Sequence, residues 1–452
     1  MTALKRIARL SAAFLGSNVA RGGIAFVLSL VIGRALGVER FGRWVWCTTW
    51  AATLTFVCDL GLGLLLPRDG ARTEDVGAAI RDSIGELAGS ALVLRLAVAI
   101  PAAAVMIVAA PWVAGDAETV RGLQLAALLG LVSAVYGCVG AAFRSRPARV
   151  PAILVVETSW HGVQLAASFA WVRAQPTASV AALLAIAVAV QLLQTITALA
   201  MWRTAFGADA RIRVPGWRFT RDTLRRALPF AAAGLVANVQ NRLAPLMLGS
   251  LSTQTDIGAF GAASRFATTA RLAPGAIFAG ALPVLTQAHG DERAQSDEAF
   301  RAFDRLFAVL TAVTVLPALL FARPLLRLVY GPAFVSAAPT LVWMAIGLAP
   351  ALTNSATKIA LYAVGRERTA MAWSAVSLAT QAAAALWLMP AFGAEGAAMA
   401  IAIGEFVIWL PLRRANRAAR TASPSSPRRA PTPTLAPPRP VVADVPDPAA
   451  AR

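Results

Sequence analysis

Arginine side chains within long apolar segments are the part of this sequence whose chemistry stands out. Arg21 lies in the middle of such a segment, with Asn18 one helical turn before it. Arg242 follows Asn238 and Asn241 at a spacing that places all three side chains on one face of a helix. A guanidinium offers five donors in a planar fork and binds phosphate oxygens in pairs. Several such groups around one cavity predict a site for an anion, and for pyrophosphate in particular.

Three further cations lie in later apolar segments, namely Arg265, Arg271 and Lys358. Ionisable side chains at membrane depth are costly and tend to line cavities, so these residues are also candidates for substrate binding. For Lys358 there is an alternative, because its long flexible stem could carry the ammonium to the membrane interface.

Two acidic residues, Asp59 and Glu157, are candidates for ion pairs or for coupling to an ion. A buried structural pair of Arg21 with Asp59 is the alternative to a cavity-lining role for Arg21. The sequence shows no paired catalytic constellation and no G-x-x-x-x-G-K-[ST] phosphate loop. Its 3 cysteines and 2 histidines do not suggest a metal site. We therefore expect no catalytic residues, no bound metal and no cofactor.

The composition indicates what kind of secondary structure positions these side chains. Of the 452 residues, 58% are hydrophobic and only 14% are charged, and the mean hydropathy is +0.63. A soluble domain has roughly 25% charged residues, so the apolar surplus must face lipid. At about 20 residues for each crossing, the apolar runs predict an all-α integral membrane protein with twelve transmembrane helices. Soluble enzymes, fibres and disulfide-stabilised secreted proteins are excluded.

The net charge of +19 arises from 42 Lys and Arg against 23 Asp and Glu. Such a balance in a soluble protein would suggest nucleic acid. With the N-terminus placed in the cytoplasm, however, most Lys and Arg fall in loops on the inner side, as the positive-inside rule requires. We therefore expect both termini in the cytoplasm and no nucleic acid partner.

A long basic connection in the middle of the chain divides it into two halves. The predicted parts are an N-terminal six-helix lobe (1–202), a cytoplasmic basic linker (203–226), a C-terminal six-helix lobe (227–414) and a disordered cytoplasmic tail rich in Pro and Arg (415–452). Weak self-similarity supports this division, because Gly33 and Gly42 correspond to Gly249 and Gly258. Each half begins inside and holds an even number of helices, so the halves are predicted to be parallel repeats with a substrate site between them.

Several short motifs resemble those of the polysaccharide transporters, the oligosaccharide flippases of the multidrug/oligosaccharidyl-lipid/polysaccharide exporter superfamily. Their order and spacing follow that family over nearly the whole chain up to about Leu412. The matching segments are RALGVERFG at 34–42, AASR at 262–265, LP at 282–283, VYGPAF at 329–334, GR at 365–366 and FGAEGAA at 392–398.

The resemblance implies a V-shaped, exporter-type fold in the bacterial cytoplasmic membrane. Members of the family move undecaprenyl-pyrophosphate-linked oligosaccharide repeat units for O-antigen (lipopolysaccharide), capsule or exopolysaccharide assembly. By position, Arg21 and Arg265 match places where related flippases carry cations that line the cavity. The implied partners are the lipid-linked glycan, membrane lipid and possible polymerase and chain-length machinery.

Two other functions stay open at this stage. A multidrug or cation antiporter of the same superfamily would be expected to prefer interior acids, and here the interior cations outnumber them. A membrane polysaccharide polymerase or ligase would need a substantial outer domain, whereas the predicted outer connections are short.

Overall fold

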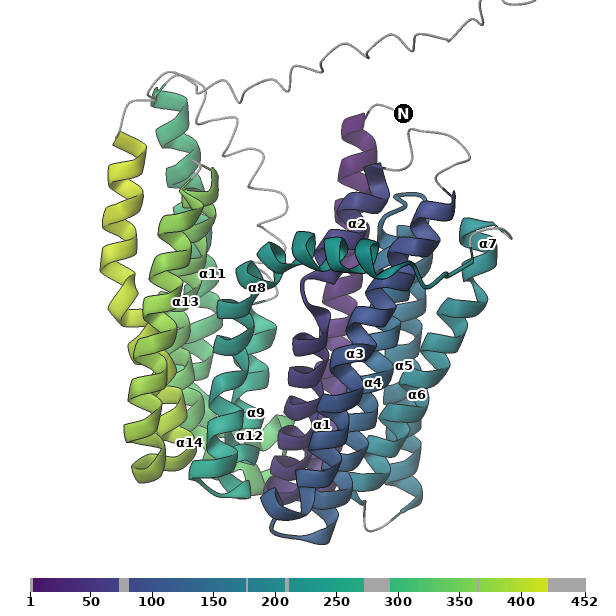
Figure 1. Cartoon of the computed structure of the whole chain (residues 1–452). Helices are drawn as coiled ribbons and strands as arrows, with labels where there is room; N and C mark the ends of the chain where they lie inside the picture. Colours follow the sequence, from purple (N-terminus) through teal and green to yellow (C-terminus); the bar gives the residue numbers. More distant parts are fainter. Residues whose placement is uncertain are drawn as a thin grey trace, which may run out of the picture.

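The protein is an assembly of long helices that run side by side in two bundles (Figure 1). The computed structural model describes residues 3–72, 81–175, 178–207, 211–271, 293–363 and 366–421. Within these ranges the regular elements are all helical, which confirms the predicted all-α class. Of the tail predicted to be disordered (415–452), residues 415–421 are helical, and residues 422–452 lie outside the described residues together with the motif at 282–283.

The N-terminal bundle consists of the elements before the central connection. They are α1 (Ala3–Asp59), α2 (Leu62–Arg72), α3 (Arg81–Val113), α4 (Ala117–Arg144), α5 (Val150–Ala174), α6 (Val180–Ala200) and the short α7 (Trp202–Phe206). The C-terminal bundle contains α8 (Trp217–Leu251), α9 (Gln254–Ala270), α11 (Arg293–Leu320), α12 (Ala322–Val329), the 3-10 helix η3 (Pro332–Ala337), α13 (Ala338–Ala363) and α14 (Glu367–Thr421).

The two longest elements are each interrupted by a glycine kink. Gly37 in α1 has φ 69° and Gly393 in α14 has φ 52°, both in the left-handed region that side chains disfavour. Each element is therefore two helical segments joined at a turn. Both glycines belong to the family-like motifs at 34–42 and 392–398. The left-handed backbone conformation at these two positions explains why glycine occupies them.

Multi-pass membrane insertion is evident from helix length and composition. Within the described ranges, six helices are long and apolar enough to cross a membrane, and α11 with α12, bent by 84°, would make a seventh. The kinked α1 and α14 each count once among the six. Neither α5 nor α8 is among them, because arginine, glutamate and amide side chains lower their hydropathy. The number twelve accordingly stays a prediction.

The predicted basic linker is partly helical. Residues 211–216 are non-helical and cross α3, where the Arg213 N–H donates to the Gly85 carbonyl over 3.4 Å. The first part of α8 then runs across the ends of α2 and α3 before the helix turns into the bundle (Figure 1). Pro229, which cannot donate to the helical ladder, lies in this helix. Arg226 holds the crossing part against α2 through Asp69, 2.7 Å away.

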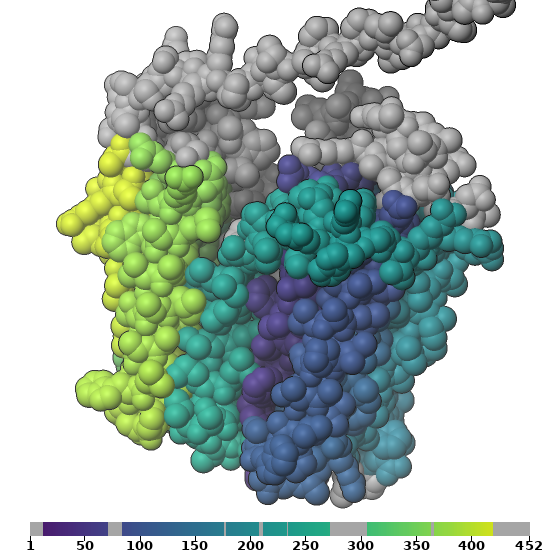
Figure 2. All heavy atoms as spheres, viewed as in Figure 1, coloured from purple at the N-terminus to yellow at the C-terminus, as the bar shows by residue number. Residues whose placement is uncertain are grey.

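The two bundles meet closely at the end where α1 is kinked. A Cβ added to Gly42 would lie 1.8 Å from the carbonyl oxygen of Gln254, and one added to Gly258 would lie 2.0 Å from that of Val38. The backbones of α1 and α9 are therefore in direct contact at this crossing. Only glycine, which has no Cβ, permits such a close approach. Figure 2 shows the bundles packed together over the lower part of the visible face.

Polar contacts tie the bundles together at the same end. The hydroxyl groups of Ser29 and Tyr330 are 3.0 Å apart, and Arg34 Nε donates to the Val329 carbonyl over 2.7 Å. Gly33 leaves room for the Tyr330 ring, since a Cβ added to this glycine would lie 2.7 Å from the ring. The repeat-related glycines noted in the sequence thus lie where the two halves touch.

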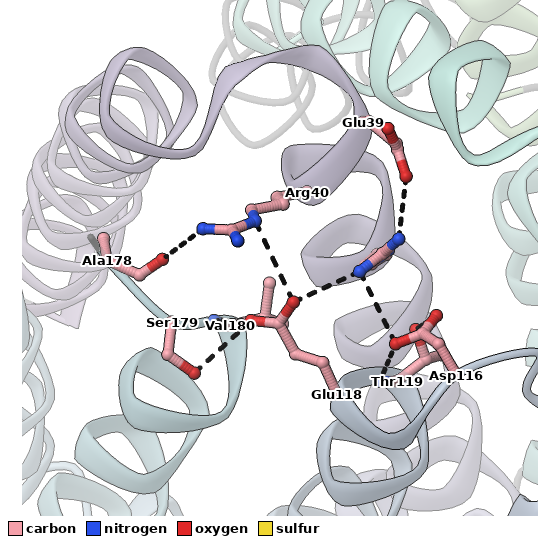
Figure 3. A network of polar contacts seen from close by, with 9 residues as sticks. Glu39, Arg40, Asp116, Glu118, Thr119, Ala178, Ser179 and Val180 are labelled. Carbon is pink, nitrogen blue, oxygen red and sulfur yellow. Dashed lines mark hydrogen bonds and ion pairs between the residues drawn. The ribbon is translucent and has the colours of Figure 1, made fainter.

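A carboxylate network neutralises cationic side chains at this end of the N-terminal bundle (Figure 3). Arg43 donates to Glu39 over 2.7 Å, to Glu118 over 3.2 Å and to Asp116 over 3.5 Å. Asp116 also caps α4 by accepting from the Thr119 N–H. Burial by itself raises the pKa of Asp116, but the Thr119 hydrogen bonds and the Arg43 guanidinium outweigh it and lower that pKa below its usual value.

Candidate functional site

Two adjoining cavities lie between the bundles. The C-terminal cavity, of about 650 Å³, is lined by α1, α8, α9, α13 and α14, and the N-terminal cavity, of about 530 Å³, mainly by α1, α4, α5 and α6. Both are lined by Thr48, Ala52, Asn238 and Arg242, which belong to the second segment of α1 and to α8. These two elements therefore form the boundary at which the cavities meet.

The C-terminal cavity brings together four residues predicted from the sequence. Asn241, Arg242, Arg265 and Arg271 all line it, and Glu405 is the acidic residue in its wall. Within the described part of the chain, no carboxylate forms an ion pair with any of the three arginines. The wall of this cavity consequently carries an excess of positive charge.

Arg242 is held by its own helix. Its Nη1 donates to the side-chain oxygen of Asn238 over 2.8 Å and to the Asn238 carbonyl over 3.3 Å, and its guanidinium lies 5.5 Å from the centre of the Phe56 ring. Its Nε is buried and has no acceptor among the described residues. Because neutral groups orient the guanidinium, its charge remains available to a ligand in either cavity.

Arg265 and Arg271 are placed by α9. A capping box between Thr253 and Asp256 begins this helix, and Arg271 directly follows its last residue. The guanidinium of Arg265 lies 5.9 Å from the centre of the Trp44 ring of α1. An aromatic face stabilises a cation without neutralising it, so Arg265 also keeps its full charge.

Two amide side chains contact the Glu405 carboxylate. Asn354 Nδ2 donates to its carboxylate over 2.8 Å and Gln240 Nε2 over 3.5 Å. Lys358, one turn after Asn354 on α13, is half-buried and interacts electrostatically with Glu405, but it is not among the residues that line either cavity. The structure thus places Lys358 behind the cavity wall.

Arg21 lies in an ion-pair cluster of the N-terminal bundle. Its Nη1 donates to Glu157 over 2.8 Å and its Nη2 to Asn18 over 2.6 Å. Glu157 is buried and also accepts from Arg144 and, over 2.9 Å, from the Tyr136 hydroxyl. Arg21 and Asn18 are not among the residues that line either cavity. The geometry corresponds to the alternative of a structural pair, with Glu157 as the partner in place of Asp59.

Asp59 pairs with a different arginine. It accepts from Arg95 Nη2 and from the Gly63 N–H, the latter over 3.1 Å, and both Asp59 and Arg95 line the N-terminal cavity. The arginines of this cavity other than Arg242 therefore have acidic partners, Asp59 for Arg95 and Glu157 for Arg144. The two cavities therefore differ in how their arginines are paired, since among the described residues those of the C-terminal cavity have no carboxylate partner.

Several cavity residues were missed by the sequence analysis. Trp160, His161 and Gln164 of α5 and Gln191 of α6 line the N-terminal cavity. The sequence alone favours a helix–helix hydrogen bond for Gln191. The available signal was the i, i+4 spacing of Trp160 and Gln164 in an otherwise apolar helix. Among the described residues, no group of His, Cys, Asp and Glu is arranged to hold a metal ion.

Comparison with known proteins gives one family. The profile of the family described as "Polysaccharide biosynthesis protein" matches residues 8–289. None of the curated proteins matches the sequence.

Solved structures with the same fold are transporters. An inward-facing multidrug resistance MATE family transporter of the MOP superfamily has a TM-score of 0.71 at 15% identity, over 88% of this chain and 95% of that one. The lipid II flippase MurJ in an inward closed conformation has a TM-score of 0.70 at 13% identity, over 90% and 87%. A MOP superfamily transporter from Pyrococcus furiosus has a TM-score of 0.57 at 14% identity, over 92% and 96%. The fold is that of the MOP superfamily transporters.

Proposed function

The chain belongs to the polysaccharide biosynthesis protein family, and we propose that it is a flippase which moves undecaprenyl-pyrophosphate-linked oligosaccharide repeat units across the bacterial cytoplasmic membrane. In this proposal α1 and α14 each supply two membrane spans, and α3, α4, α5, α6, α8, α9, α11 and α13 supply one each, which gives the twelve that the sequence predicts. The start of α1 and the end of α14, which lie on the same side in Figure 1, face the cytoplasm.

The observation that carries this proposal is the group of arginines in the C-terminal cavity, which have no acidic partner among the described residues. Arg242 reaches the cavity from α8, Arg265 from within α9 and Arg271 from the residue that follows α9. A pyrophosphate presents several anionic oxygens, and planar guanidinium groups bind such oxygens bidentately. The glycan would follow the pyrophosphate through the hydrated space between the bundles, while the prenyl tail stays in lipid.

Alternating access is the mechanism that fits the two bundles. The close contact of Gly42 with the start of α9 closes the end that we assign to the outside. The six-helix lobes (1–202 and 227–414) would rock about the 203–226 connection, so that this contact opens while the cytoplasmic end closes. In the absence of a phosphate loop, the driving force must come from an ion gradient, the membrane potential or the gradient of the substrate.

We expect Gly42→Ala to shift the protein toward a state that is open at the outer end. The new Cβ would lie 1.8 Å from the Gln254 carbonyl oxygen, so α1 at Gly42 and the start of α9 must move apart. Spin labels at Arg121→Cys and Arg323→Cys, both exposed near this end in different bundles, should show a longer mean distance. Gly23→Ala is the matched control, since no atom of the described residues lies within 4 Å of the added Cβ there. An unchanged distance distribution for Gly42→Ala would contradict this gate.

A multidrug or cation antiporter is the second candidate function, favoured by the MATE-like fold and by Glu405 in the cavity wall. The excess of arginine over acid in that wall argues against a cationic substrate. A polymerase or ligase has less support, because no catalytic constellation accompanies the cavities within the described residues.

A leaflet assay tests the proposed function. A deletion strain should accumulate lipid-linked repeat units on the cytoplasmic leaflet, and the wild-type gene should relieve this accumulation. Accumulation on the outer leaflet would indicate a polymerisation defect instead. Unchanged lipid-linked glycans together with altered susceptibility to cationic drugs would favour the antiporter.

A further inference from the structure

The N-terminal cavity has a lining that differs in kind from that of its neighbour. Neutral polar and aromatic groups dominate it, including Thr48, Ser133, Trp160, Gln164 and Gln191. Two of its three arginines are ion-paired, Arg95 with Asp59 and Arg144 with Glu157, which Arg144 shares with Arg21. Among the described residues, the arginine of this cavity that has no acidic partner is Arg242, which both cavities share, so the lining offers no separate cluster of arginines for a second phosphate group.

Three of these polar side chains have no protein partner among the described residues. Within that part of the chain, Trp160, Gln164 and Gln191 form no side-chain hydrogen bond, although all three are half-buried. Polar groups inside a membrane protein are normally satisfied by neighbouring helices. Gln194 on the same helix as Gln191 behaves in that ordinary way, since it is buried and interacts with Tyr136. The three free side chains therefore have donors and acceptors available for a ligand.

Their arrangement suits a sugar. Trp160 and Gln164 are one helical turn apart on α5, so they share a face, and Gln191 reaches the same cavity from α6. An amide can donate to one hydroxyl and accept from another, and an indole ring offers an apolar face with one donor at its edge. Vicinal hydroxyls and the C–H face of a pyranose are complementary to these groups.

We propose that the N-terminal cavity is the glycan subsite, in which Trp160, Gln164 and Gln191 hold sugar residues of the oligosaccharide. This inference rests on the proposed function and divides the substrate between the cavities, with pyrophosphate at the arginines of the C-terminal cavity. Arg242 lines both cavities, so a ligand with its pyrophosphate there can extend its first sugars toward α5 and α6. The phosphate subsite is then common to all lipid-linked glycans, and the amide and indole groups select among them.

Equilibrium binding to the full chain in nanodiscs tests this division with two probes. One is undecaprenyl pyrophosphate without sugar, and the other is lipid-linked oligosaccharide extracted from a strain that lacks this protein. The triple variant Trp160→Ala, Gln164→Leu, Gln191→Leu should raise the Kd of the sugar-bearing probe about tenfold or more, because two hydrogen bonds and one stacking contact are lost. Its Kd for the sugar-free probe should change by less than about twofold.

Matched substitutions outside the cavity serve as controls. Trp171, on the same helix but 38% exposed on its surface, and the half-buried Gln124 do not line either cavity. Trp171→Ala and Gln124→Leu should bind both probes as the wild type does. Equal weakening of both probes by the triple variant, or no weakening of either, would overturn the glycan subsite. Unchanged binding of the sugar-free probe to Arg242→Ala and Arg265→Ala would contradict the proposed function separately.

Discussion

Arg265→Ala and Arg242→Ala are each expected to reduce surface polysaccharide by about 100-fold or more at normal expression, because each removes paired charge-assisted hydrogen bonds to pyrophosphate. Neither substitution leaves an unpaired carboxylate, since no described acid pairs with these arginines. Loss of transport should therefore occur without loss of folded protein. Complementation of a deletion strain, with the leaflet distribution of lipid-linked glycan, measures the effect.

Two controls separate charge from geometry in this experiment. Arg173→Ala removes an arginine of α5 whose guanidinium lies 5.1 Å from the Phe169 ring, away from both cavities. It should leave polysaccharide output unchanged. Arg265→Lys keeps the charge but loses the planar fork, so we expect only partial recovery. Wild-type output from both alanine variants would exclude these residues as pyrophosphate ligands.

Glu157→Gln should destabilise the protein by about 1–3 kcal/mol, because it leaves the guanidiniums of Arg21 and Arg144 without their buried carboxylate. The Arg21 and Arg144 side chains are 26% and 29% exposed, so water replaces only part of the lost partner. The expected result is a lower melting temperature in detergent and less folded protein in size-exclusion chromatography.

A triple variant distinguishes charge pairing from side-chain packing. Arg21→Met, Arg144→Met and Glu157→Leu together remove the whole cluster and keep similar volumes, and such replacements are often neutral or stabilising. The melting temperature should recover to near the wild-type value. If Glu157→Gln is as stable as the wild type, the cluster does not stabilise this bundle.

The same triple variant decides the role of Arg21. A single Arg21→Ala substitution removes a possible ligand, but it also disturbs Glu157, so reduced transport alone cannot identify the cause. If the triple variant is folded and transports at the wild-type level, Arg21 is structural. If it is folded and inactive, one of the two arginines acts on the substrate, and restoring Arg21 and Arg144 one at a time identifies which, because Arg144 lines the N-terminal cavity.

Composition and helical spacing were sufficient for the class of the protein and for part of the site. The apolar surplus required membrane helices, and the spacing of Asn238, Asn241 and Arg242 required one polar face, since neighbours within a helix follow from its 3.6-residue period. The motifs at 34–42 and 392–398 contain Gly37 and Gly393, and only the structure shows that each lies at a kink whose backbone conformation glycine adopts readily.

Contacts between helices were decided only by the tertiary structure. Arg21 and Glu157 are 136 positions apart, and no sequence period shows which acid a distant arginine will meet. Arg21 and Arg242 therefore looked alike in the sequence, as arginines with an asparagine nearby in an apolar helix. Packing places a buried carboxylate against Arg21 and an aromatic ring against Arg242. The sequence determined how much positive charge enters the membrane, and the packing of the helices determined which of it remains free to bind a ligand.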